Sequence, residues 1–298
     1  MIKKNEITAL LITSAIKSIP EIRKNMNAVS KVSYNLNFIE ETLENIKNFS
    51  GIDNFIIVHD LKIDSKFSLI HSKNLFRIKG KYNFDLFTSP SSLAMPSQLT
   101  ASNAFKLGIN KVKTKYLLFW EHDHLFTQKV NWEIVSKSFN YGGKLIKFNR
   151  LKNNINAKKH LQKELILEKG VTNQLFDSLH KDLVETNFYC NGPFISETDF
   201  CKDLWENVNY QIPDWNGSFG GFIEGPVNQK MLEEQLNENE DHFRKKYPLY
   251  VYGGQSSDPI VIHRGTYIPK YKFNLFSFDT YRNIPRILKH KLFNILRI

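Results

Sequence analysis

The chain carries the stretch YLLFWEHDH at residues 116–124, where a run of large apolar side chains is followed directly by carboxylates and imidazoles. The apolar run is short and rich in aromatic residues, which predicts a buried β-strand. Side chains of an extended segment alternate between faces, so Glu121 and Asp123 are expected to point the same way. Two carboxylates on one face at a strand end suit a hard divalent cation, Mg²⁺ or Mn²⁺. The alternative is a solvated strand end whose charges mark where the core stops.

Strand and helix patterns alternate through the first half of the chain. Short apolar runs predict buried strands at residues 8–13, 55–58 and 116–120, and apolar residues at helical spacing predict helices at 38–49 and 98–112. The alternation predicts an α/β domain, Rossmann-like, with a mainly parallel sheet flanked by helices.

The segment between the second and third of these strands has weaker patterns. Residues 75–78, together with Phe67 and Leu69, are interpreted as short extended pieces. The serines and prolines of residues 89–97 predict a loop before the second helix.

Three of the predicted strands end in polar side chains. Thr13-Ser14 follows the first, His59-Asp60 the second, and the carboxylates of residues 121–123 the third. Ligands of parallel sheets bind outside the carboxyl ends of the strands. The coincidence predicts one ligand site at this edge and strengthens the prediction of a metal there.

Composition and charge limit the classes of protein to which the chain can belong. The 298 residues are 41% hydrophobic, enough for a sizeable core, and the formal net charge of +11 favours anionic partners. The two cysteines, Cys190 and Cys201, form no disulfide framework or zinc pattern, so free thiols in a reducing compartment are expected. No segment resembles a signal peptide or a membrane span, which predicts a cytoplasmic protein.

The order of these motifs resembles a nucleotide-sugar glycosyltransferase of the GT-A fold, most similar to the large inverting family that builds bacterial surface polysaccharides. The similarity rests on the N-terminal strand, a strand followed by His59-Asp60, the helix at 101–108 and the motif at 116–123. The resemblance implies that Asp60 contacts the nucleoside, and that Glu121 and Asp123 hold a metal that bridges the donor diphosphate. Thr13, Ser14 and Asn103 are assigned to the same donor site.

The second half supplies the remaining groups of that reaction. Glu224 is the only acidic residue between Asp214 and Glu233 and stands where a glycine-rich loop opens a helix. The resemblance implies that it is the catalytic base, whereas the alternative is an acid that only favours the helix dipole.

A predicted strand at residues 259–262 leads to two further candidates. The resemblance implies His263 as a third metal ligand, and Arg264 suits a diphosphate. A structural role for His263 remains the alternative. His122 and His124 are expected to point away from the two carboxylates.

The C-terminal end predicts a separate element. From residue 279 onward apolar residues recur every three or four positions with basic residues between them, which predicts a basic amphipathic helix. It either lies on a membrane surface or docks on the domain. We therefore divide the chain into a catalytic domain at 1–270, with halves at 1–125 and 126–270, and a helical extension at 271–298.

The expected activity is transfer of a sugar from a nucleotide-sugar donor to a hydroxyl of a glycan or lipid-linked acceptor. It is expected to depend on Mn²⁺ or Mg²⁺, to invert the anomeric centre and to serve surface polysaccharide synthesis, with peripheral contact to the inner face of the membrane. A metal-dependent phosphoesterase is the alternative, because it also uses clustered carboxylates and histidines. No recognised nucleic-acid-binding motif is present, so no specific nucleic-acid partner is expected.

Overall fold

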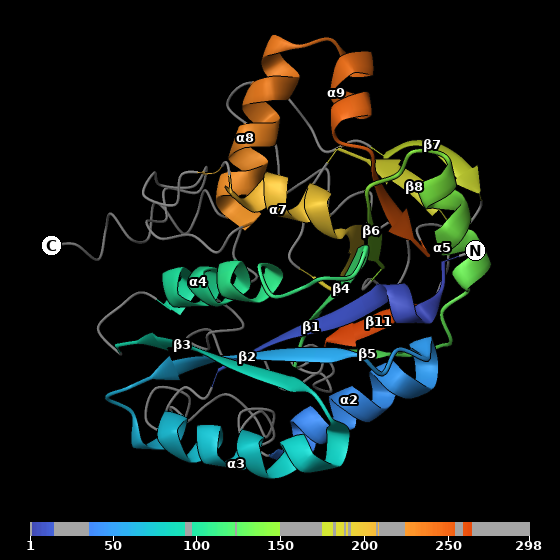
Figure 1. Cartoon of the computed structure of the whole chain (residues 1–298). Helices are drawn as coiled ribbons and strands as arrows, with labels where there is room; N and C mark the ends of the chain where they lie inside the picture. The colour runs from blue at the N-terminus through green and yellow to red at the C-terminus, as the bar shows by residue number, and fades with distance from the viewer. Residues whose placement is uncertain are drawn as a thin grey trace, which may run out of the picture.

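The structure, a computed structural model, describes residues 2–14, 36–92, 97–122, 124–149, 175–180, 183–187, 189, 192–206, 208, 224–253 and 259–263. Within these ranges the chain forms a nine-stranded sheet, a separate two-stranded sheet and helices on both faces of the large sheet (Figure 1).

The strands are β1 Ile7–Ser14, β2 Phe55–Lys62, β3 Asp85–Ser91, β4 Tyr116–Glu121, β5 His124–Phe126, β6 Leu145–Phe148, β7 Leu175–His180, β8 Leu183–Thr186, β9 Phe194–Glu197, β10 Leu249–Tyr252 and β11 Val261–His263. The helices are η1 Lys4–Glu6, α2 Leu36–Ser50, α3 Lys66–Tyr82, α4 Ser97–Ile109, α5 Trp132–Asn140, α7 Thr198–Glu206, α8 Glu224–Asn237 and α9 Glu240–Lys246.

The large sheet has the strand order β3-β2-β1-β4-β9-β6-β10-β8-β7. β1 pairs in parallel with β2 and β4, β2 with β3, and β6 with β10, whereas β9 and β8 pair antiparallel with their neighbours. Following the pairings across the sheet, seven of its nine strands point the same way, and β9 and β8 run opposite. The prediction of an α/β fold with a mainly parallel sheet is confirmed.

Two apolar cores lie on opposite faces of this sheet, because successive side chains of a strand point to opposite sides. On β1, Ile7 and Leu11 face the core shared with α2 and α3, whereas Leu10 and Ile12 face the core shared with α4 and α7. Figure 1 shows α2 and α3 below the sheet and α4 and α7 above it. Burial on both faces explains why the central strands are continuous apolar runs that the sequence makes easy to find.

Two elements between β2 and β4 differ from the prediction. The segment interpreted as extended pieces, which includes Phe67, Leu69 and residues 75–78, is the helix α3. Part of the predicted loop is the strand β3, which contains Pro90. β3 is the edge strand of the sheet, the position where a strand tolerates proline because one side of its backbone needs no partner.

Several boundaries and untested predictions can be placed on this fold. β2 continues through His59 and Asp60 to Lys62, so these residues lie in the strand and not after it. The predicted boundary at residue 125 falls within β5, and the large sheet takes strands from both predicted halves. The predicted extension at 271–298 lies outside the described residues.

Two smaller findings complete the fold. Cys201 is a free, buried thiol, and Cys190 lies outside the described residues. In the part of the chain that the structure describes, no helix has the length and hydropathy to cross a membrane.

Candidate functional site

The carboxyl ends of β1, β2 and β4 lie side by side at one edge of the sheet. Ser14 is in register with Asp60 on one side, and Ile12 is in register with Glu121 on the other. The structure therefore brings together three polar segments that are far apart in the sequence, and the edge can carry a ligand site of the kind found in α/β sheets.

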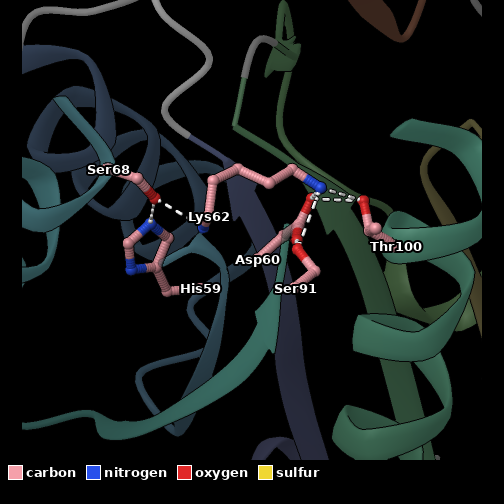
Figure 2. A network of polar contacts seen from close by, with 6 residues as sticks. All are labelled: His59, Asp60, Lys62, Ser68, Ser91 and Thr100. Atoms are coloured by element: carbon pink, nitrogen blue, oxygen red, sulfur yellow. Dashed lines mark hydrogen bonds and ion pairs between the residues drawn. The ribbon is translucent and has the colours of Figure 1, made fainter. Parts of the chain in front are cut away.

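Asp60 lies in a buried polar network on the α4 side of this edge (Figure 2). Its carboxylate accepts hydrogen bonds from Ser91 Oγ at 2.9 Å and Thr100 Oγ1 at 2.8 Å, and lies 3.0 Å from Lys62 Nζ. Lys62 Nζ also donates to Ser91 Oγ at 3.0 Å and to Thr100 Oγ1. Both side chains of the ion pair are 3% exposed. Both carboxylate oxygens have protein partners, so direct contact with a nucleoside would require this network to open.

The opposite face of β2 carries a second polar group, built from neutral imidazoles. His59 is fully buried, its Nε2 lies 3.3 Å from Ser68 Oγ, and its ring stands edge-on to that of His71, with 5.0 Å between centroids. Thr13 Oγ1 lies 3.1 Å from His71 Nε2. Burial lowers the pKa of His59 to about 4 and the pKa of His71 to about 3, so both rings are neutral at pH 7.

Ser68 on α3 joins the two polar groups. Its hydroxyl oxygen accepts a hydrogen bond from the Lys62 backbone N–H at 2.9 Å and also contacts His59 (Figure 2). One strand end is thus held from both sides, by α3 through Ser68 and by α4 through Thr100. These contacts from both helices fix the position of the sheet edge at which a ligand would bind.

Glu121 ends β4, and the chain turns at His122 before β5 begins. The Glu121 side chain is 28% exposed, and its Oε2 lies 3.3 Å from Nδ1 of the fully buried His124. The prediction that His124 points away from the carboxylates is wrong for Glu121, because the turn ends the strand alternation on which it relied. Asp123 lies outside the described residues.

Side chains of α2 and β4 hold the turn at His122 and the strand β5 in place. Thr42 Oγ1 on α2 donates to the His122 carbonyl at 2.8 Å, and Trp120 Nε1 donates to the His124 carbonyl at 2.9 Å. Asn45 Nδ2, also on α2, donates to the Phe126 carbonyl at 3.1 Å. These contacts hold the predicted metal motif against the body of the domain.

β11 lies next to this motif. It pairs antiparallel with β5, and His263 is in register with His124 although 139 positions separate them in the chain (263 − 124). The backbone of the predicted third metal ligand is therefore adjacent to the predicted metal motif. The His263 side chain and Arg264 lie outside the described residues.

Glu224 is the first residue of α8, and its side chain is not among those described. One turn later, Asn228 Nδ2 donates to the Tyr189 carbonyl at 2.8 Å and Asn228 Oδ1 accepts from the Tyr189 N–H at 2.9 Å. Trp205 Nε1 on α7 donates to the Tyr189 hydroxyl at 3.0 Å. The start of α8 is thus tied to Tyr189 and, through it, to α7; no pattern in the sequence distinguishes Tyr189.

The remaining predicted donor-binding residues lie on β1 and α4. Thr13 and Ser14 lie at the end of β1, and Asn103 is an exposed residue of α4, three positions after the buried Thr100. Among the side chains that the structure describes, no three of His, Cys, Asp or Glu are arranged to hold a metal. Asp123 and the His263 side chain are not among these described side chains. The part of the predicted ligand set that is described, a partly exposed carboxylate at a strand end, fits a hard cation.

Comparisons with known proteins give distant structural similarity only. No protein-family model and no curated protein matches the chain. The solved structures that match include S. aureus TarS 1–349 in complex with UDP-GlcNAc, at 9% identity and a TM-score of 0.43, covering 90% of this chain and 59% of the TarS chain. UTP-bound UGPase from Acinetobacter baumannii matches at 12% identity and a TM-score of 0.47, covering 87% and 89%. The chain thus spans about three fifths of the TarS chain. At these scores neither match says anything about activity, and the fold class rests on the strand order and directions.

Proposed function

We propose that the protein transfers a sugar from a nucleotide-sugar donor to a hydroxyl group of a glycan or lipid-linked glycan, with inversion at the anomeric carbon. The donor would lie across the carboxyl ends of β1, β2 and β4. The pairing of β11 with β5 carries the proposal, because it brings the His263 backbone next to the Glu121-His122-Asp123 turn. The same pairing buries Phe126 and Val261 in the core, and polar residues from two distant segments that meet at a sheet edge are typical of a binding site.

In this proposal Glu121, Asp123 and His263 hold Mn²⁺ or Mg²⁺ at the donor diphosphate. When bound, the cation neutralises negative charge on the leaving nucleoside diphosphate. Thr13, Ser14, Asn103 and Arg264 are proposed to bind the donor, with the Arg264 guanidinium suited to phosphate oxygens. Asp60 is proposed to support the donor site indirectly. Through its contacts with Lys62 and Thr100 it holds the start of α4 beside the ends of β1 and β2.

Glu224 is proposed as the base. It begins α8 at the end of the glycine-rich loop, and its carboxylate would accept the proton of the acceptor hydroxyl. The acceptor oxygen forms a bond to the anomeric carbon while the bond from that carbon to the diphosphate oxygen breaks. The diphosphate keeps the bonding electron pair, and the acceptor proton passes to Glu224. One displacement of this kind inverts the anomeric centre. A place in surface polysaccharide synthesis is proposed on the resemblance described above.

Replacing Glu224 with glutamine is expected to slow nucleoside diphosphate release at least about 100-fold, because a positioned general base contributes about 10²–10⁴ in rate. The assay follows nucleoside diphosphate released from a panel of nucleotide-sugars in Mn²⁺, with water or added sugars as acceptor. Nucleotide binding should persist in the variant, since the amide keeps the shape of the side chain.

Glu233→Gln is the matched control, because Glu233 is an exposed acid on the same helix and should retain the wild-type rate. An unchanged rate in Glu224→Gln would exclude this residue as the base. Phosphoester hydrolysis without any release from nucleotide-sugars would instead favour the phosphoesterase.

A further inference from the structure

Helix α3 carries large apolar side chains on its outward side. Leu69, Ile70 and Phe76 are 45%, 46% and 61% exposed, and Ile63 in the turn just before the helix is 59% exposed. Four of the six large hydrophobic residues exposed in the described part of the chain thus fall within 14 positions. Single exposed apolar residues are ordinary, but a cluster marks an interaction surface.

The same side of α3 is basic. Lys73 and Arg77 are exposed between the apolar residues, at helical spacing that places them on one face with Leu69 and Phe76. From Lys66 to Tyr82 the sequence has five lysines and arginines and no acidic residue. Among the described side chains of α3, only Lys81 forms an ion pair. Its Nζ lies 2.8 Å from Glu40 Oε2 on α2. We call Ile63, Leu69, Ile70, Lys73, Phe76 and Arg77 the α3 outer face.

Among the described elements, none packs on this face of α3. The opposite side of the helix packs in the core shared with α2, where Leu75 and Ile78 are buried. In Figure 1, α3 runs along the lower boundary of the molecule, with no labelled helix or strand outside it. With 17 residues it presents a straight surface of about 25 Å.

We propose that the α3 outer face docks the protein on an anionic lipid membrane. Exposed apolar side chains beside lysine and arginine can bind the interface of an anionic bilayer through both apolar burial and charge. The apolar groups enter the boundary between headgroups and acyl chains while the cations meet anionic headgroups. The α3 outer face has no acidic residue, so its charge is complementary to an anionic surface.

Docking through α3 would also orient the domain. α3 follows β2 directly, so the first turn of the helix adjoins the carboxyl edge where Asp60 and Ser14 lie. The candidate site would then stand beside the membrane surface. The docking surface is independent of the proposed transfer reaction and of the C-terminal segment.

Vesicle sedimentation of the full chain tests the proposal. The wild-type protein is compared on vesicles of phosphatidylcholine and on vesicles of phosphatidylcholine mixed with phosphatidylglycerol. We expect tighter binding to the anionic vesicles, and a loss of at least about tenfold in the double variant Leu69→Ser/Phe76→Ser. The double variant Lys73→Glu/Arg77→Glu should lose about as much on anionic vesicles and little on neutral ones.

Matched controls separate docking from misfolding and from other contacts. Tyr141→Ser removes an equally exposed aromatic residue elsewhere, since Tyr141 is 71% exposed, and should bind as the wild type does. The changed side chains are exposed, so melting temperatures should remain at the wild-type value. Wild-type vesicle binding that both α3 variants retain would overturn the proposal and assign it to another segment, such as residues 279–298. Absence of wild-type binding, or an effect of the α3 variants on self-association alone, would also overturn it.

Discussion

Replacing Asp60 with alanine is expected to lower the free energy of unfolding by about 3–5 kcal/mol, the usual cost of leaving one member of a buried ion pair without its partner. Lys62 would remain 3% exposed with its ammonium group facing only the hydroxyls of Ser91 and Thr100. Those two hydroxyls would lose their acceptor as well. Urea unfolding at neutral pH measures the change.

Two further variants make the interpretation specific. Asp64→Ala is the control, because Asp64 is an exposed acid in the following turn that accepts a hydrogen bond from Ser92 Oγ at 2.8 Å, and should cost less than about 1 kcal/mol. The double variant Asp60→Ala/Lys62→Met should recover most of the lost stability, since it removes the buried charge. A loss below about 1 kcal/mol for Asp60→Ala would contradict the buried network.

Lowering the pH from 8 to 5 is expected to cost about 4 kcal/mol of unfolding free energy through His59 and His71 together. Burial depresses the pKa of both side chains, from 6.5 to about 4 for His59 and about 3 for His71. Between pH 6.5 and about 4 the unfolded chain therefore binds protons that the native protein does not. The stabilisation is complete above pH 6.5 and is lost as the pH falls. Below about 3 the two states bind equally and no further loss arises from these groups.

Urea unfolding at a series of pH values in wild type and variants measures this linkage. His59→Gln and His71→Gln should each remove about half of the loss between pH 8 and 5, because each histidine contributes about 2 kcal/mol at pH 5. His242→Gln is the control for replacing a histidine elsewhere, since the His242 side chain is 57% exposed. If the double variant His59→Gln/His71→Gln kept the full pH dependence, the two imidazoles would not be its source.

The sequence predicts the centre of this fold better than its periphery. β1 and β4 are buried on both faces, so their apolar runs leave little ambiguity about strand or helix. β3 escapes prediction because an edge strand tolerates Pro90 and half-exposed residues. α3 escapes because its outward apolar residues obscure the helical period, and these are the residues proposed to meet a membrane.

The candidate site shows a similar division. Polar residues that end strands could be found from the sequence, because parallel strands place their carboxyl ends together. The partners that bury Asp60 could not, since Lys62 is a residue type rarely found inside and Thr100 comes from a helix 40 positions away. The contact of His124 with Glu121 depends on a turn after β4, and no local sequence pattern predicts that turn.

The central claim is that the edge formed by β1, β2 and β4 binds a nucleotide-sugar with a divalent cation. Thermal shift with a panel of nucleotides and nucleotide-sugars, with and without Mn²⁺, measures it directly, because a ligand that binds only the native state raises the melting temperature. We predict a Mn²⁺-dependent shift with one class of nucleotide that is lost in Asp123→Ala and kept in Asp199→Ala, an exposed acid on α7. A folded wild-type protein that shows no shift with any member of the panel would contradict the proposed function.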